Sequence, residues 1–138
     1  SALDDAYDSY NYLINKGYTP DKITLVGESA GGGLCYSLAL KLKEEGRESP
    51  AGIVAISPWT DMCATGDSYN YNASLDPTMS IKALNFYKSA YTSDYKNPLV
   101  SPLYGELTDL PPCLIFAGGD EIMKSDAEEM HKKLKTLE

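Results

Sequence analysis

The sequence predicts an α/β fold, formed as a single domain over residues 1–138, with a parallel sheet of three strands and helices on both faces. Three short apolar runs, at residues 23–26, 52–57 and 113–117, have the composition of strands that are buried on both sides. Stretches with the 3.6-residue period of amphipathic helices separate them. A strand, a crossover helix and a second strand in the same sheet normally run parallel.

The first predicted helix begins at Ser1, where Ser1 and Asp4 resemble a capping box, and ends near Gly17. Its apolar face repeats at helical spacing, through Leu3, Ala6, Tyr7, Tyr10, Leu13 and Ile14. The first strand follows a turn at Pro20. A second helix runs from the end of that strand to about Gly46, with Leu34, Leu38 and Leu42 on one face.

Pro58 closes the second strand, and the polar stretch from there to about Thr78 is predicted to be a loop. Ser80 opens another amphipathic helix. Residues 92–112 hold four prolines and have no clear period, which indicates irregular structure. The third strand, 113–117, leads into a turn at 118–121 and a final helix, whose apolar face comprises Ala127, Met130, Leu134 and Leu137.

Composition excludes several classes of function. A formal net charge of −8 disfavours a nucleic-acid or anionic-membrane surface. No apolar stretch is long enough to cross a membrane, and no signal peptide is visible. The three cysteines, Cys35, Cys63 and Cys113, are odd in number and lack ligand-like spacing, which suits reduced thiols in the cytoplasm. With a single histidine, no metal site is expected.

Residues 27–31 have the pattern Gly-x-Ser-x-Gly, directly between a predicted strand and a predicted helix. This context is typical of a nucleophile elbow, in which a serine occupies a strained turn with its hydroxyl exposed above the sheet. We expect small residues at Gly27 and Gly31 because larger side chains would collide across so tight a turn. Ser29 is therefore the candidate nucleophile.

Asp120 follows the third strand, as Ser29 follows the first. Because the carboxyl ends of parallel strands meet at one edge of the sheet, both residues should emerge on the same rim. This makes a catalytic pair plausible on topology alone. The loop from Met62 to Ile81, with its tyrosines, is a candidate lining for an acyl pocket, since such loops commonly carry function.

A longer series of motifs resembles the hormone-sensitive-lipase-like carboxylesterases of the α/β-hydrolase fold. It comprises residues 27–33, Ser57 to Asp61, Asp76-Pro77, Pro98 to Leu103, and Leu110 to Pro112 followed by a strand and Gly119 to Glu121. The resemblance implies hydrolysis of a small-molecule ester by a Ser-Asp-His triad without any cofactor.

Carried onto this chain, the resemblance makes Ser29 the nucleophile and Asp120 the acid that orients the histidine. Glu121, the neighbouring carboxylate, remains an alternative for the acid. The backbone N–H of Ala30 corresponds to one donor of the oxyanion hole. Glu28 stands where the family often has Asp, and we interpret it as structural.

Two parts of the family pattern are missing. No His-Gly-Gly-Gly type motif precedes the elbow, and the family's catalytic histidine follows one more strand after the acid. The single histidine, His131, lies within the predicted final helix and is not expected to reach Ser29. The sequence is thus expected to be an internal fragment of an esterase that is inactive alone. Unpaired strand edges at both sides of its sheet favour homo-oligomers.

Two other functions fit the same residues. A framework of this fold without the triad histidine can serve as a non-catalytic ligand-binding protein. A peptidase or amidase would differ in substrate rather than machinery, so fold alone does not decide. A histidine about 25 to 35 residues beyond Glu138, just past another strand, would favour the enzyme over the binding protein.

Overall fold

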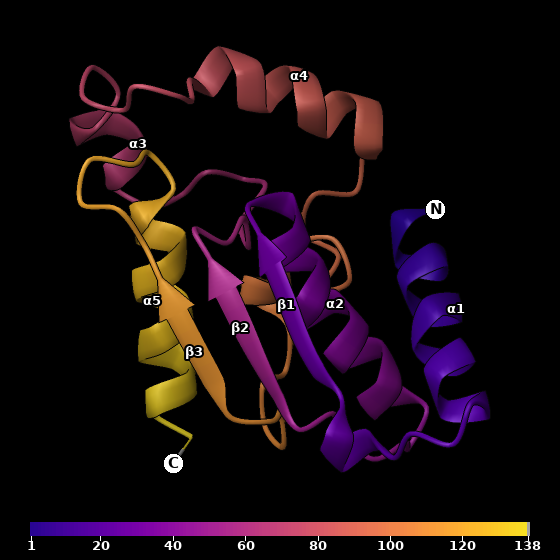
Figure 1. Cartoon of the computed structure of the whole chain (residues 1–138). Coiled ribbons are helices and arrows are strands. Elements are labelled where there is room, and N and C mark those ends of the chain that lie inside the picture. Colours follow the sequence, from indigo (N-terminus) through magenta and orange to yellow (C-terminus); the bar gives the residue numbers. More distant parts are fainter. Residues whose placement is uncertain (138) are drawn as a thin grey trace.

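The computed structural model describes residues 1–137, which form a three-stranded sheet flanked by helices (Figure 1). The strands are β1 (Thr24–Glu28), β2 (Gly52–Ile56) and β3 (Cys113–Phe116), in the order β1-β2-β3 and all parallel. The helices are α1 (Ala2–Asn15), α2 (Ala30–Glu44), α3 (Ser68–Tyr71), α4 (Ile81–Tyr91) and α5 (Lys124–Lys135), with 3-10 turns at Pro20–Lys22 and Pro102–Tyr104. The predicted fold class is confirmed.

Helix starts follow the predicted capping chemistry. In α1 the Ser1 hydroxyl accepts a hydrogen bond from the Asp4 backbone N–H, and the Asp4 carboxylate accepts one from the Ser1 amino group, which completes the capping box. Gly17, with φ +100°, follows the helix end. In α4 the Ser80 side chain accepts from the Ala83 N–H.

The structure differs most from the prediction in one strand boundary and in one additional helix. β1 extends two residues further, to Glu28, because Glu28 still pairs with Ile56 of β2 before the chain turns. The stretch predicted as a loop contains α3, a helix of four residues. A helix that short has no periodic face, so hydrophobic periodicity does not detect it.

One face of the sheet packs on α2 and α5, which lie behind it in Figure 1. The largest buried cluster lies in this layer: Tyr36, Ala39 and Leu40 of α2 meet Ile53 and Ala55 of β2. α1 packs against the outer side of α2, with Tyr10 buried against Leu38 and Leu42. A third cluster, around Trp59, Met62, Tyr69, Leu84 and Ile122, lies among the segments that follow the strands.

The prediction of helices on both faces is wrong for the described residues. Side chains on the other face of the sheet are exposed: Val26 by 64%, Leu114 by 53%, Phe116 by 51% and Ile56 by 39%. The three apolar runs do form the strands of the sheet. In residues 1–137, however, helices cover only one of the two faces of that sheet.

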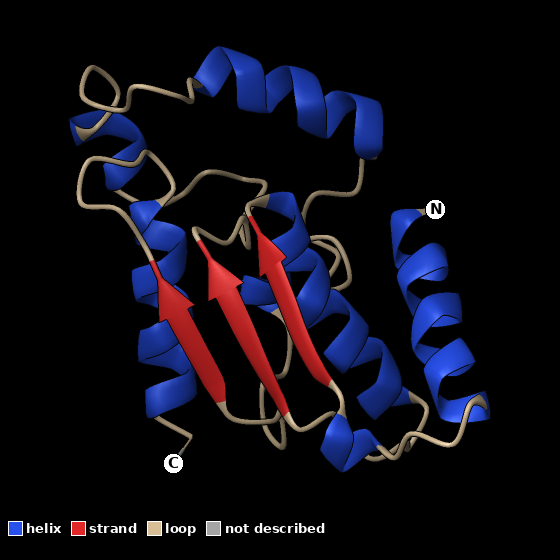
Figure 2. Cartoon of the chain, in the orientation of Figure 1, coloured by secondary structure: helices blue, strands red, loops and turns tan. Residues whose placement is uncertain are grey.

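All three strands end at the same rim of the sheet, where the loops carrying α3 and α4 lie (Figure 2). α4 crosses above this rim, away from the layer formed by α2 and α5 (Figure 1). None of the described helices combines the length and the apolar character needed to cross a membrane.

Candidate active site

Ser29 occupies the turn between β1 and α2 with φ 53° and ψ −118°, a backbone conformation that non-glycine residues rarely adopt. Such strain costs about 1–3 kcal/mol and persists only where the surroundings impose it. Here the Ser29 N–H donates to the carbonyl of Ile56 (2.9 Å), and the Ser29 carbonyl accepts from Gly33 (3.1 Å) and Trp59 (2.9 Å). The turn has the geometry expected of a nucleophile elbow.

The glycines around Ser29 serve different purposes. A Cβ on Gly27 would overlap the backbone of Gly31, so the small residue predicted before the serine is required. A Cβ on Gly31 would meet nothing within 4 Å, and the steric reason predicted for this glycine is therefore wrong. Gly32 and Gly33 instead allow α2 to approach the segment after β2, because a Cβ on either would press on the backbone of Pro58 or Trp59.

Ala30 is the first residue of α2, so its N–H has no acceptor within the helix. It lies immediately after Ser29 at the positive end of the helix dipole. This is the position required of an N–H that stabilises an oxyanion formed at Ser29.

A pocket of about 470 Å³ opens beside Ser29. Its walls are mainly apolar and come from several elements: Leu34 of α2, Trp59 and Met62 after β2, Met79 before α4, Leu84, Tyr87 and Tyr91 of α4, and Val100. Met62 and Met79 belong to the segment predicted to line a pocket. The tyrosines of that segment do not line it, because Tyr69 is buried in the core and Tyr71 points to solvent with half its surface exposed.

Asp120 lies in the turn after β3, on the same rim as Ser29, and β2 lies between the two strands that carry them. Its carboxylate is exposed and has no hydrogen-bond partner among the described residues. Glu121 differs. Its carboxylate accepts a hydrogen bond from the Ser57 hydroxyl (2.7 Å) and another from the Gly118 N–H (3.0 Å). Of the two predicted candidates for the acid, Glu121 is already held by these two donors, whereas the Asp120 side chain has no hydrogen bond in residues 1–137.

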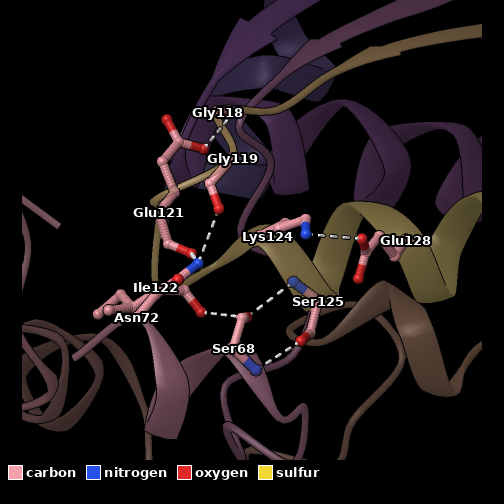
Figure 3. A network of polar contacts seen from close by, with 9 residues as sticks. All are labelled: Ser68, Asn72, Gly118, Gly119, Glu121, Ile122, Lys124, Ser125 and Glu128. Atoms are coloured by element: carbon pink, nitrogen blue, oxygen red, sulfur yellow. Dashed lines mark hydrogen bonds and ion pairs between the residues drawn. The ribbon is translucent and has the colours of Figure 1, made fainter. Parts of the chain in front are cut away.

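The turn that carries Asp120 is held by α3 and the residues after it (Figure 3). The Asn72 side-chain amide donates to the carbonyls of Gly119 (3.0 Å) and Glu121 (2.8 Å). The Ser68 hydroxyl donates to the Ile122 carbonyl (2.6 Å), and the Asp76 carboxylate accepts from the Ile122 N–H (2.9 Å). Asp76 belongs to a motif of the family resemblance, whereas Ser68 and Asn72 belong to none of the motifs found in the sequence.

Asp126 is a buried acid that sequence reasoning also missed. It is 1% exposed and accepts hydrogen bonds from the N–H groups of Thr60 and Asp61 (both 2.9 Å) and from the Tyr69 hydroxyl (2.8 Å). Burial raises the pKa of Asp126 to about 7, outweighing the lowering effect of these donors. An aspartate in the first turn of a helix ordinarily indicates a solvated charge beside the dipole, so its position gave no signal of burial.

His131 is exposed on α5 and lines a separate groove beside β3, together with Pro112, Leu114 and Glu128. It does not line the pocket at Ser29. Among residues 1–137, no three His, Cys, Asp or Glu side chains group closely enough to hold a metal ion.

Comparison with known proteins agrees with this geometry. The whole chain, residues 1–138, matches the family described as alpha/beta hydrolase fold. The chain belongs to the alpha/beta hydrolase fold family. It is 34% identical over 134 residues to an acetyl-hydrolase of Streptomyces hygroscopicus, and 35% identical over 135 residues to an esterase of Acinetobacter venetianus. Each alignment covers 96% of this chain and 45% of the relative.

Solved structures of esterases are also similar to this chain. An esterase from the bacterial hormone-sensitive lipase family matches with a TM-score of 0.94 at 37% identity, covering 98% of this chain and 46% of that one. Human hormone-sensitive lipase is 32% identical over 104 residues. The predicted resemblance to hormone-sensitive-lipase-like esterases is confirmed. The chain spans about half the length of the acetyl-hydrolase and of the two esterases, whereas its alignment with human hormone-sensitive lipase covers 70% of this chain and 10% of that protein.

Proposed function

We propose that the protein is a serine hydrolase of carboxylic esters, in which Ser29 is the nucleophile. The observation that carries the proposal is the elbow itself. Ser29 has the strained conformation of a nucleophile, Gly27 is sterically required beside it, and an apolar pocket opens at its side. Relatives named esterase and acetyl-hydrolase support ester hydrolysis as the reaction.

In this mechanism the Ser29 hydroxyl attacks the ester carbonyl and loses its proton to a base. The negative charge that develops on the carbonyl oxygen is stabilised by the Ala30 N–H at the start of α2. The alcohol leaves, an acyl-serine remains, and water hydrolyses it in the same way. No cofactor takes part.

Asp120 would orient the histidine that acts as base. Two strand spacings separate β1 from β3, roughly 10 Å, which leaves room for an imidazole between the Ser29 hydroxyl and the Asp120 carboxylate. The absence of a competing partner on Asp120, in the part of the chain that the structure describes, supports its choice over Glu121.

These 138 residues do not supply the base. Their one histidine, His131, lines the groove beside β3 and not the pocket at Ser29. Without a base the hydroxyl is a weak nucleophile at neutral pH, and loss of a triad member costs several orders of magnitude in rate. The 138-residue polypeptide by itself is therefore expected to hydrolyse esters negligibly.

The pocket favours a small apolar acyl group. Leucine, methionine, valine and tryptophan side chains make up much of its walls, while Glu28 and Ser37 are among its few polar members, so an apolar acyl group loses least on burial there. The three cysteines are unpaired, which supports a reducing compartment such as the cytoplasm.

Acylation of Ser29 tests the proposal directly. Imidazole added to the solution can replace a missing general base. We expect p-nitrophenyl butyrate plus imidazole to leave one butyryl group on the chain, seen in its intact mass and mapped to Ser29. The Ser29→Ala variant should remain unmodified, while Ser57→Ala, which changes a serine on the same rim, should still be acylated. Butyryl groups on lysines alone would contradict the proposal.

A non-catalytic ligand-binding protein is the second candidate. It is favoured by a pocket that the described residues form without any base at Ser29. Trp59, the one tryptophan of the chain, lines this pocket, so its fluorescence reports binding. Saturable quenching by butyrate esters in a chain that is never acylated at Ser29, even with imidazole, would favour this candidate.

A further inference from the structure

We propose that Asn72 is a positioning residue for Asp120. Its one side-chain nitrogen donates to the carbonyl of Gly119 and to the carbonyl of Glu121, the residues on either side of Asp120 (Figure 3). The inference rests on the acid role of Asp120 proposed above.

Asn72 has no other evident purpose at this place. It is 2% exposed, and it comes directly after α3, 47 and 49 positions away in sequence from the two residues that it binds. A buried amide nitrogen requires two acceptors, and both are peptide carbonyls of the acid-bearing turn. Both hydrogen bonds of this buried NH2 group therefore fix the backbone next to Asp120.

The other contacts to the turn act elsewhere. Ser68 and Asp76 hold the two backbone groups of Ile122, which follow Asp120 by two residues. The Glu121 carboxylate accepts a hydrogen bond from the N–H of Gly118, which precedes Asp120 by two residues. Among the described residues, only the Asn72 side chain bonds to backbone carbonyls of both neighbours of Asp120, Gly119 and Glu121.

The Asp120 carboxylate thus has no hydrogen-bond partner in the described chain, while Asn72 holds the backbone carbonyls of its two neighbours. The Asp120 side chain makes no internal hydrogen bond in the described chain, so nothing but its backbone determines where it points. An acid that orients a histidine must hold its place before the histidine docks. Asn72 supplies that constraint from a different segment, directly after α3.

Asn72→Asp is the sharpest test because it keeps the shape of the side chain and removes both N–H donors. Asn72→Leu removes them without adding a charge. Asn70→Asp is the matched control: it makes the same chemical change in α3 at an exposed side chain with no hydrogen bond. The readouts are amide hydrogen exchange and the ¹⁵N order parameter of Asp120, and neither requires turnover.

We expect amide exchange at Glu121 and Ile122, whose N–H groups are hydrogen bonded to Gly118 and to Asp76, to accelerate about tenfold or more in both Asn72 variants. The order parameter of Asp120 should fall from about 0.85 toward 0.6, while exchange in β1 and β2 and the whole Asn70→Asp variant stay unchanged. An unaltered turn, or an equal acceleration throughout the chain, would overturn the inference. Failure of Ser29 acylation with a loosened turn would reject the proposed function and leave the contact between Asn72 and the turn intact.

Discussion

Among single residues, Gly27 and Gly31 of the elbow have the same place in the sequence pattern but differ in how much space surrounds them. The pattern Gly-x-Ser-x-Gly predicts the position of Ser29, and its strained backbone agrees with that prediction. The pattern does not reveal that only Gly27 is sterically confined, because confinement depends on how closely α2 returns to β1. Gly32 and Gly33, outside the pattern, are confined by a different approach, that of α2 to Pro58 and Trp59 after β2.

This difference gives a matched pair of substitutions. Gly27→Ala places a methyl group against the backbone of Gly31, and we expect a loss of unfolding free energy of about 1–3 kcal/mol or more. Gly31→Ala meets open space within α2, where alanine is the better helix former, so it should be neutral or stabilising by up to about 1 kcal/mol. Urea unfolding of the two variants measures both. Equal losses would contradict the steric account.

The buried Asp126 predicts a dependence of stability on pH. Because its pKa is raised from 3.8 to about 7, the folded chain binds this proton more tightly than the unfolded chain. The stabilising effect of that proton is complete below about pH 4 and is lost as the pH rises through 7. Asp126→Asn keeps the shape and the acceptor for Thr60 and Asp61 but cannot titrate.

We therefore expect the unfolding free energy of the wild type to fall relative to Asp126→Asn between pH 4 and 7.5, by about 4 kcal/mol at most. Urea titrations at several pH values measure the difference. Curves that stay parallel over this range would show that Asp126 keeps an ordinary pKa.

Among the helices and strands, those that have a clear hydrophobic period or a capping residue could be predicted from the sequence. Those that depend on contacts between loops could not. The strands and the helices that start at Ser1 and Ser80 follow from local patterns. α3 does not, since its four residues are placed by contacts of Ser68 and Asn72 with a turn about fifty positions later. For this reason the hydrogen bonds from Ser68 and Asn72 to the turn that carries Asp120 could not be predicted from the sequence.

α4 gives a test at this scale. Leu84 is its only buried residue, whereas Phe86 is 70% exposed, although both are large and apolar. Leu84→Ala should detach α4 from the Trp59 cluster, accelerate hydrogen exchange throughout 81–91 and weaken binding of apolar ligands in the pocket. Phe86→Ala should change neither the hydrogen exchange of residues 81–91 nor the binding of apolar ligands. Exchange in α4 that is indifferent to Leu84 would mean that other contacts hold it.

At the scale of the whole molecule, the exposed sheet face is the largest departure from the prediction. Val26, Ile56, Leu114 and Phe116 form an apolar surface between two strands, β1 and β3, whose outer edges have no partner strand in residues 1–137. Such edges and faces promote association. We propose that the 138-residue chain self-associates through them.

Light scattering measures this association as a function of concentration. We expect the mean mass to rise above that of a monomer, and Val26→Lys with Leu114→Lys to reduce it, because charges on the exposed face oppose docking. The matched control is Phe86→Lys, which alters an exposed residue away from the sheet. A clean monomer at high concentration would contradict the proposal.

We propose that these 138 residues carry a complete nucleophile elbow and lack the base that activates it. Steady-state hydrolysis of a short-chain p-nitrophenyl ester, measured against imidazole concentration in the wild type and in Ser29→Ala, tests both halves at once. We predict identical rates for the two proteins without imidazole, and a rate in the wild type that rises above that of Ser29→Ala as imidazole is added. Turnover without imidazole that disappears in Ser29→Ala would contradict the missing base, and identical rates at every imidazole concentration would contradict Ser29 as the nucleophile.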